Sequence, residues 1–199
     1  MPYTFYDSTI PTCQSILRTL AHILQKAQST HPSPESLLSA RLHESMYPLA
    51  DQLRIAAQWT ENLAARFTGR DQPTQFGGNP ATLAEALERI NTVLDSLAGA
   101  DRETVDARAE TLAPTPMGPG VVVEKSGAEY AHAIALPNVY FHLATAYGIL
   151  RKEGIELGKR DYYEGGLSRS QPTCKDGWWP QAEKVLLMQA SGVSVLGTG

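Results

Sequence analysis

Residues 126–158 constrain the fold more than any other part of the sequence, because they read as one long helix with apolar residues on more than one side. Ser126 and Glu129 have the spacing of a capping box at the start of a helix. Gly154 stands where a helix ends on a left-handed residue, directly after a basic last turn. A helix of this kind needs other helices around it, so the sequence predicts a helical bundle.

Three polar or helix-breaking residues interrupt this apolar helix. Pro137 removes a backbone hydrogen bond, and we expect it to kink the helix. Asn138 and His142 are four residues apart, so they lie on one face. A buried polar group without a partner costs about 1–3 kcal/mol, so this pair must find partners in the bundle, for which Gln52 is a candidate. The pair is the leading candidate for a functional site.

Three further amphipathic stripes predict the other long helices of the bundle, and a short helical turn follows the first of them. Asn79 is the expected N-cap of the third long helix and Pro80 its first residue. The expected helical segments are residues 8–28, 34–40, 48–67 and 80–97.

The segment before the fourth long helix has the composition of a β-hairpin. We expect strands at residues 110–114 and 121–125, because β-branched valines favour strands. The bundle would then occupy residues 1–164, followed by a C-terminal extension over residues 165–199. That extension contains Trp178, Trp179 and a possible helix at 180–190, and we expect it to pack on the bundle or on a partner subunit.

Composition excludes several classes of protein. The chain has 199 residues, a net charge of −4 and a pI near 5.7, which argue against nucleic-acid binding. No apolar run approaches the roughly 18 residues of a membrane span, and the N-terminus lacks the features of a signal peptide. Cys13 and Cys174 have no zinc-site spacing, so we expect a cytoplasmic protein with two free thiols, with a disulfide between them as the alternative.

Two stretches carry a resemblance to a known family. SLLSARLHESMYPLADQLRIAA and ALPNVYFHLATAYGILRKEGIELGKRDY are similar to the family labelled domain of unknown function 1993, which belongs with the DinB/YfiT-like four-helix bundles. The resemblance extends from about residue 6 to 163 and implies an all-α, DinB-like bundle. Relatives occur in bacteria and fungi, and the long tail favours a fungal member. The family name implies no activity.

The resemblance also raises the question of a metal. The wider superfamily often binds a divalent metal through three histidines, two of them as His-x-x-x-His on the fourth helix. Here that pair reads Asn138-x-x-x-His142, and the second helix offers Gln52 and Gln58. Amides are poor ligands for zinc or nickel, and His132 lies about 15 Å along the helix from His142. We therefore expect no metal and no cofactor.

The candidate site residues allow two interpretations. In the first, His142 is a general acid or base beside Asn138 and Gln52, since imidazole titrates near neutral pH. In the second, these three residues are an interior polar group that only joins two helices. The candidate substrate-binding residues are Trp59, Tyr130, Tyr140 and His43, although tyrosines on a helix commonly just pack and His43 fits a surface position.

Three functions remain open at this point. We favour a cofactor-independent enzyme, an isomerase, cyclase or lyase, acting on a small apolar organic substrate, for example in fungal specialised metabolism. Such chemistry needs only a shaped apolar pocket and one or two polar groups. The alternatives are a non-catalytic ligand-binding or oligomerising bundle, and a metal-dependent DinB-like enzyme. We also expect a homodimer.

Overall fold

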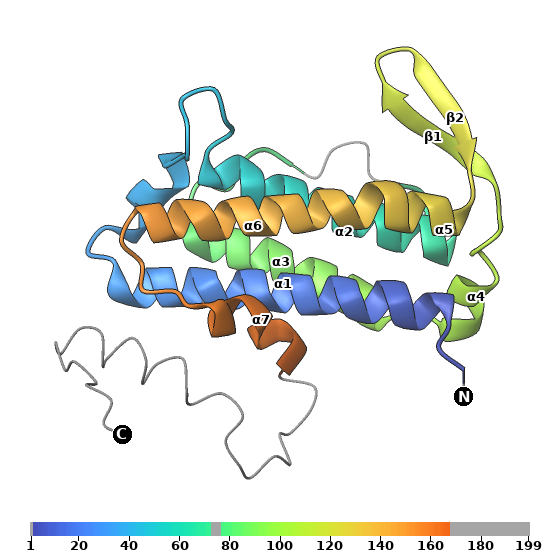
Figure 1. Ribbon diagram of the computed structural model, residues 1–199, viewed down its shortest axis with the longest axis horizontal. Coiled ribbons are helices and arrows are strands. Elements are labelled where there is room, and N and C mark those ends of the chain that lie inside the picture. The colour runs from blue at the N-terminus through green and yellow to red at the C-terminus, as the bar shows by residue number, and fades with distance from the viewer. Residues whose placement is uncertain (1, 73–76, 168–199) are drawn as a thin grey trace, which may run out of the picture. The chain divides into compact units, whose positions relative to one another are not determined.

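The structure is a computed structural model that describes residues 2–72 and 77–167 (Figure 1). Three long helices, α1 (Phe5–Thr30), α2 (Leu49–Thr68) and α3 (Leu83–Ala98), lie side by side with a fourth. The fourth is built from α5 (Gly127–Glu129), η2 (Tyr130–Ala135) and α6 (Leu136–Lys152). The expected four-helix bundle with a hairpin before the fourth helix is confirmed.

Side-chain caps fix where the helices begin. Thr4 and Asp7 form a reciprocal capping box at the start of α1, so this helix begins three residues before the expected start. The third helix begins later than expected, because Thr82, rather than Asn79, accepts the hydrogen bond from the Glu85 backbone. The expected cap at Asn79 and start at Pro80 are therefore wrong. Asn79 instead accepts a hydrogen bond from Arg54 at 2.8 Å.

The fourth helix passes through Pro137 by means of a π-helical turn, η2. The Leu136 N–H donates to the carbonyl of Ala131, five residues back, instead of four. Proline has no N–H, and a wider turn before it accommodates the missing bond. The ribbon continues from α5 to α6 (Figure 1), so a local π turn takes the place of the kink that the sequence suggested.

The core is formed by the apolar stripes of the four helices. Fully buried side chains come from α1, α2, α3 and α6, among them Leu17, Leu63, Ile90 and Ile149. By length and composition alone, the helical stretch Gly127–Lys152 is apolar enough to cross a membrane. Half of its most apolar window is buried inside the bundle, as in the core helix of a globular domain.

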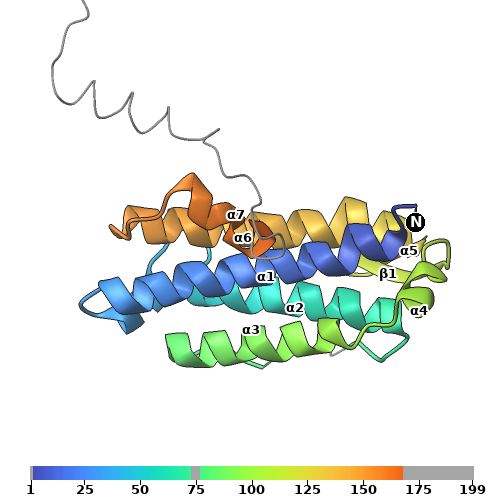
Figure 2. The ribbon, with the colours of Figure 1, turned by 90° about the horizontal axis from the view of Figure 1, so that it is seen from below.

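Shorter elements connect and cover the bundle. η1 (Pro34–Ser39) is a 3₁₀ helix after α1, and α4 (Arg102–Asp106) follows α3. α7 (Lys159–Leu167) lies against α1 (Figure 2). The sequence analysis expected no helix there. The possible helix at 180–190 and nearly all of the expected extension lie outside the described residues.

α7 is held to α1 by a very close backbone approach and by a charged cluster. A Cβ built on Gly165 would lie 2.0 Å from the Ser15 carbonyl oxygen, so only glycine fits this contact. Asp161 accepts hydrogen bonds from His22 at 2.8 Å and from Lys26 at 3.1 Å, and it also caps the start of α7 through the Gly158 N–H.

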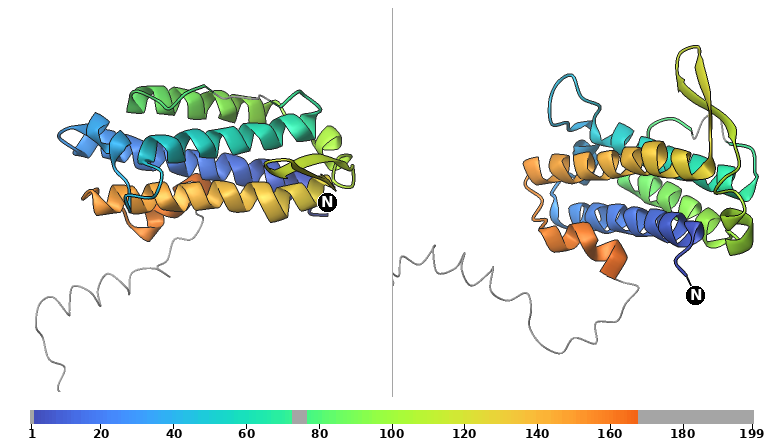
Figure 3. Two further views of the ribbon diagram at one scale, coloured as in Figure 1. Left: turned by 90° about the horizontal axis from the view of Figure 1, so that it is seen from above. Right: turned by 45° about the vertical axis from the view of Figure 1, so that its right-hand side comes forward.

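The hairpin consists of β1 (Ala113–Gly118) and β2 (Val121–Lys125) and projects beyond the helices (Figure 3). The second strand has the expected bounds, whereas the first begins three residues later than expected. Arg66 of α2 holds the base of the hairpin, donating to the Thr115 hydroxyl at 2.9 Å and to the Lys125 carbonyl at 2.6 Å. The hairpin is therefore fixed at its base and exposed at its tip.

Candidate functional site

The seam between α2 and the fourth helix carries most of the residues singled out by the sequence. Gln52, Trp59 and Arg66 are seven residues apart on α2, so they form a row along one face of that helix. Each of the three contacts a residue of the fourth helix or the start of its hairpin. The seam therefore combines polar and aromatic groups along one face of α2.

His142 and Gln52 meet in this seam. Nδ1 of His142 lies 2.7 Å from Oε1 of Gln52, and the Gln52 amide nitrogen donates to the Tyr47 carbonyl at 2.9 Å. The contact with Tyr47 fixes the orientation of the amide, because a carbonyl can only accept. Oε1 then faces His142 and can only accept as well, so Nδ1 carries the proton. Nε2 of His142 is consequently the nitrogen with the lone pair.

The surroundings of His142 keep the imidazole neutral. The side chain is 7% exposed, and burial lowers its pKa to about 4, with the charge of Arg54 acting in the same direction. Nε2 has no hydrogen-bond partner among the described residues. Nε2 is thus an uncharged acceptor without a protein partner in the described part of the chain.

A loop of residues 40–48 covers the start of α2 and reaches the fourth helix. Its ends are joined by a hydrogen bond from the Leu49 N–H to the Ala40 carbonyl at 2.8 Å. Lys152 of α6 donates to the Arg41 carbonyl at 2.7 Å, which ties the loop to that helix. The Tyr47 carbonyl that orients the Gln52 amide belongs to this loop, so the loop is linked to His142 through Gln52.

Large apolar side chains lie exposed around this place. Phe141 is 56% exposed, and its ring meets the His142 ring edge to face at 5.3 Å. Tyr47 and Leu42 of the loop are also exposed, and Leu42 lies over Gly148 of α6. Exposed apolar groups beside a polar group with an open acceptor are typical of ligand sites. We call Leu42, Tyr47 and Phe141 the apolar rim.

The structure separates the remaining sequence candidates from His142. Asn138 turns back on its own helix and donates to the Ile134 carbonyl at 2.8 Å. Tyr140 is exposed, and His43 is an exposed loop residue paired with Ser45 at 2.8 Å. None of these three bonds to His142 within the described residues, although His43 belongs to the loop that orients Gln52.

Trp59 and Tyr130 form a second group in the same seam. Trp59 follows Gln52 on α2 by seven residues, which is about two helical turns. Their ring centroids are 6.5 Å apart, and the Arg66 guanidinium lies 4.4 Å from the centroid of Tyr130. Tyr130 is only 4% exposed, and burial raises its pKa to about 12. This group packs the bundle against the hairpin base. The sequence analysis missed Arg66, although its position seven residues after Trp59 could have indicated it.

The donors in the seam do not fit the three-histidine metal site of the superfamily. His142 supplies one imidazole, while Gln52 and Asn138 supply amides that already bond to other groups. No group of three or more His, Cys, Asp or Glu side chains that could hold a metal occurs within residues 2–72 and 77–167. One imidazole with two amides is a weak donor set for a transition metal.

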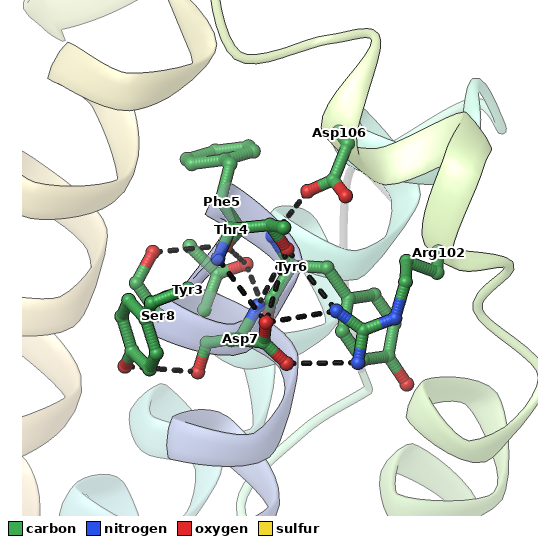
Figure 4. Close-up of polar contacts among 9 residues, drawn as sticks. Tyr3, Thr4, Phe5, Tyr6, Asp7, Ser8, Arg102 and Asp106 are labelled. Carbon is green, nitrogen blue, oxygen red and sulfur yellow. Dashed lines mark hydrogen bonds and ion pairs between the residues drawn. The ribbon is translucent and has the colours of Figure 1, made fainter. Parts of the chain in front are cut away.

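A polar cluster at the start of α1 is a useful contrast, because Asp7 and Arg102 are paired with each other in it (Figure 4). Arg102 of α4 makes two bonds of 2.8 Å to the Asp7 carboxylate and lies over the Tyr6 ring. The hydrogen bond from Arg102 lowers the pKa of Asp7 to about 2. Asp106 accepts from the Tyr6 N–H at 2.6 Å. These contacts join α4 to α1.

Comparisons with known proteins agree with this architecture. The family model described as Domain of unknown function (DUF1993) matches residues 5–163. The crystal structure of a DinB family member protein from Shewanella denitrificans is similar, with a TM-score of 0.69 and 34% sequence identity. That match covers 79% of this chain and 90% of the other. A comparison with curated proteins gives no significant match. The chain therefore belongs to the DUF1993 family and has the DinB-like helical fold.

Proposed function

We propose that this protein is a cofactor-independent enzyme that moves a proton on a small, mostly apolar organic substrate, as an isomerase, cyclase or lyase does. One observation carries the proposal, namely that His142 is held neutral in a single tautomer with Nε2 open. One nitrogen is fixed by Gln52, and the other has no protein partner among the described residues and can accept a hydrogen bond from a ligand.

The reaction would begin with a hydrogen bond from the substrate to Nε2. His142 can accept a proton there from an acidic C–H or O–H group, while its Nδ1–H remains bonded to Gln52. Burial and Arg54 disfavour the imidazolium, so the proton is returned to another atom of the substrate. The developing negative charge on the substrate offsets this penalty during the reaction. Proton removal and return leave His142 unchanged.

The apolar rim indicates what kind of substrate would bind. Phe141 presents an exposed ring next to the imidazole, and the loop that orients Gln52 carries two further exposed apolar side chains, Tyr47 and Leu42. Aromatic and aliphatic side chains bind apolar or planar molecules by burial of surface, at roughly 25 cal/mol per Å². We therefore expect a neutral substrate with a planar apolar part and at least one acidic hydrogen.

The experiment is complementation of a deletion strain of the source organism, read out by untargeted metabolite profiling. His142→Gln should accumulate the same compound as the deletion, whereas the wild type should not. His132→Gln is the matched control, because His132 is an exposed histidine on the same helix. Full complementation by His142→Gln would overturn the assignment of His142.

A second step separates an enzyme from a binding protein. The accumulated compound is incubated with purified protein, with and without a chelator. Conversion that survives the chelator and is lost in His142→Gln supports proton transfer by the side chain. Binding without conversion would favour the alternative of a non-catalytic bundle. Conversion abolished by the chelator would favour a metal-dependent enzyme. The fungal origin and a role in specialised metabolism stay predictions that the identity of the compound would test.

A further inference from the structure

The two edges of the hairpin differ in their ability to bind another strand. In β1, Pro114 pairs with Glu124 and Pro116 pairs with Val122. Proline has no N–H, so neither pair can exchange two backbone hydrogen bonds. The bonded pairs of the ladder are therefore the alternating ones, Ala113 with Lys125 and Thr115 with Val123.

This pattern leaves one edge blocked and the other open. On the outer edge of β1, Pro114 and Pro116 offer carbonyls but no donors, which is a common protection of edge strands. On the outer edge of β2, Val122 and Glu124 each direct an N–H and a carbonyl outward. No backbone hydrogen bond joins residues 121–125 to a helix or loop of the described chain. The β2 edge is the one that a further strand can join.

Exposed apolar side chains accompany this open edge. Val122 is 62% exposed and Val121 is 51% exposed, and on the other strand Met117 is 50% exposed. Leu112, just before β1, is 63% exposed. An apolar edge strand without protection pairs readily with another chain. With prolines on β1 and valines on β2, the β2 edge is the one at which a partner strand would bind.

We propose that this partner is a second copy of the same chain, bound through antiparallel pairing of the two β2 strands about a two-fold axis at Val122. Such an interface is self-complementary, as the common two-fold dimers are. It makes a four-stranded sheet with the proline-containing β1 strands on both outer edges. Those edges cannot accept a further strand readily, so the assembly closes as a dimer.

The register follows from the charges of the strand. Only the outward-directed residues can form the bonded pairs, so the axis lies at Val122, Val123 or Glu124. An axis at Glu124 places this carboxylate opposite its own copy, which is unfavourable. An axis at Val123 places Val122 opposite a glutamate. An axis at Val122 places Val122 opposite Val122 and Val121 opposite Val123, with both charged residues beyond the valines.

The hairpin base is rigid enough to present this edge. Arg66 bonds to both strands through Thr115 and the Lys125 carbonyl, which fixes the hairpin before any partner arrives. The interface is small, however: one pair of short strands buries less surface than the roughly 1,200–2,000 Å² in total that stable dimers bury. We therefore expect a reversible dimer whose dissociation constant is on the order of micromolar.

The experiment uses full-length protein in sedimentation velocity over a range of concentrations. The wild type should dimerise reversibly. Val122→Lys and Val122→Glu should each weaken the dimer at least about tenfold, because each charge meets its own copy across the axis. An equal mixture of the two variants should associate again, since lysine then faces glutamate. Tyr3→Lys is the control, because Tyr3 is 77% exposed and far along the chain from the hairpin.

Val122→Pro tests the same edge by another route. It removes an outward N–H and leaves the bonded pairs within the hairpin, so the helical circular dichroism should be kept while the dimer is lost. A wild type that is monomeric at all concentrations would overturn the proposal. So would a dimer that both charged variants retain. Exchange protection of the Val122 and Glu124 amides that does not depend on protein concentration would mean that something other than a second copy covers the edge, and would overturn it too.

Discussion

The seam between α1 and α7 and the seam between α2 and α6 are both polar, but they are completed differently. In the first, Asp161 receives hydrogen bonds from His22, Lys26 and the Gly158 backbone. In the second, His142 has one nitrogen bonded to Gln52 and the other without a partner in the described chain. The first seam is charged and saturated, and the second is neutral and open.

The two seams also differ in how much of their polar groups is exposed to solvent. His22 and Lys26 keep about a third of their side-chain surface in solvent, so a charged seam is tolerated there. His142 is far less exposed, and a neutral imidazole is the form that burial favours. A polar group kept at this depth with an unused acceptor contributes little to folding, which is why we place function in the second seam.

The largest expected effect comes from Gly165→Ala, which breaks the first seam without touching the second. The new Cβ would meet the Ser15 carbonyl oxygen and the Thr19 N–H, both of which are backbone atoms that cannot swing aside. We expect a loss of about 3 kcal/mol in urea unfolding, at the upper end for overpacking. Gly166→Ala is the matched control, because its Cβ would lie 3.1 Å from the movable Ser15 hydroxyl. Equal losses for both variants would contradict this account.

Asp161→Asn should have the next largest effect, about 2 kcal/mol at neutral pH, because it removes an acceptor of charge-assisted hydrogen bonds. Burial raises the pKa of Asp161, but the bonds from Gly158, His22 and Lys26 outweigh it and lower the pKa from 3.8 to about 2. The unfolded chain therefore binds this proton first as pH falls. The contribution of Asp161 is present above pH 3.8 and is lost between pH 3.8 and 2. Unfolding curves of the variant should lack that loss.

Gln52→Glu should make the second seam resemble the first. A carboxylate opposite Nδ1 stabilises the imidazolium, so the pKa of His142 should rise from about 4 to about 6 or higher in an NMR titration. Loss of the bond to the Tyr47 carbonyl should cost about 1 kcal/mol of folding stability.

In the wild type, the free energy of unfolding should fall as pH drops from 6.5 to about 4, because His142 takes up a proton more readily in the unfolded chain than in the folded one. This loss of stability at low pH should be smaller in Gln52→Glu. An unchanged pKa would mean that Gln52 does not orient His142.

Lys26→Met should have the smallest effect, about 0.5 kcal/mol, because exposed ion pairs contribute little. Lys26 is 36% exposed at the side chain, and the pair with Asp161 is also supported by His22. A double-mutant cycle with Asp161→Asn measures the coupling directly. A coupling above about 2 kcal/mol would show that the first seam is more tightly coupled than its exposure suggests.

The sequence predicted the bundle well, because apolar periodicity determines which residues are buried. Ser126 capped the fourth helix as expected, and Gly69 ended α2 in the left-handed region. α7 was missed because two adjacent glycines weaken a helix signal, whereas the close contact with α1 requires one of them. The first strand was misplaced because Pro114 and Pro116 look like breakers, although an edge strand tolerates them.

The site could be predicted only in part. The spacing of Asn138 and His142 put both on one face, and Gln52 was a reasonable partner for them. The sequence could not show that the Asn138 side chain bonds to its own helix, because its acceptor is the backbone carbonyl of Ile134, which leaves no signal in residue type. It also could not show the role of the Tyr47 carbonyl, since a backbone acceptor carries no signal in residue type.

The π turn of η2 has a consequence for the phase of the fourth helix. Tyr130 and His142 are twelve residues apart, which in a regular α-helix separates them by about 120° around the axis. The π turn accommodates one extra residue, which reduces this angular separation by about 100°. Both side chains therefore contact residues of α2. Pro137 directly follows this turn, so the inserted residue that accompanies it brings Tyr130, near the hairpin base, and His142 onto the same side of the fourth helix.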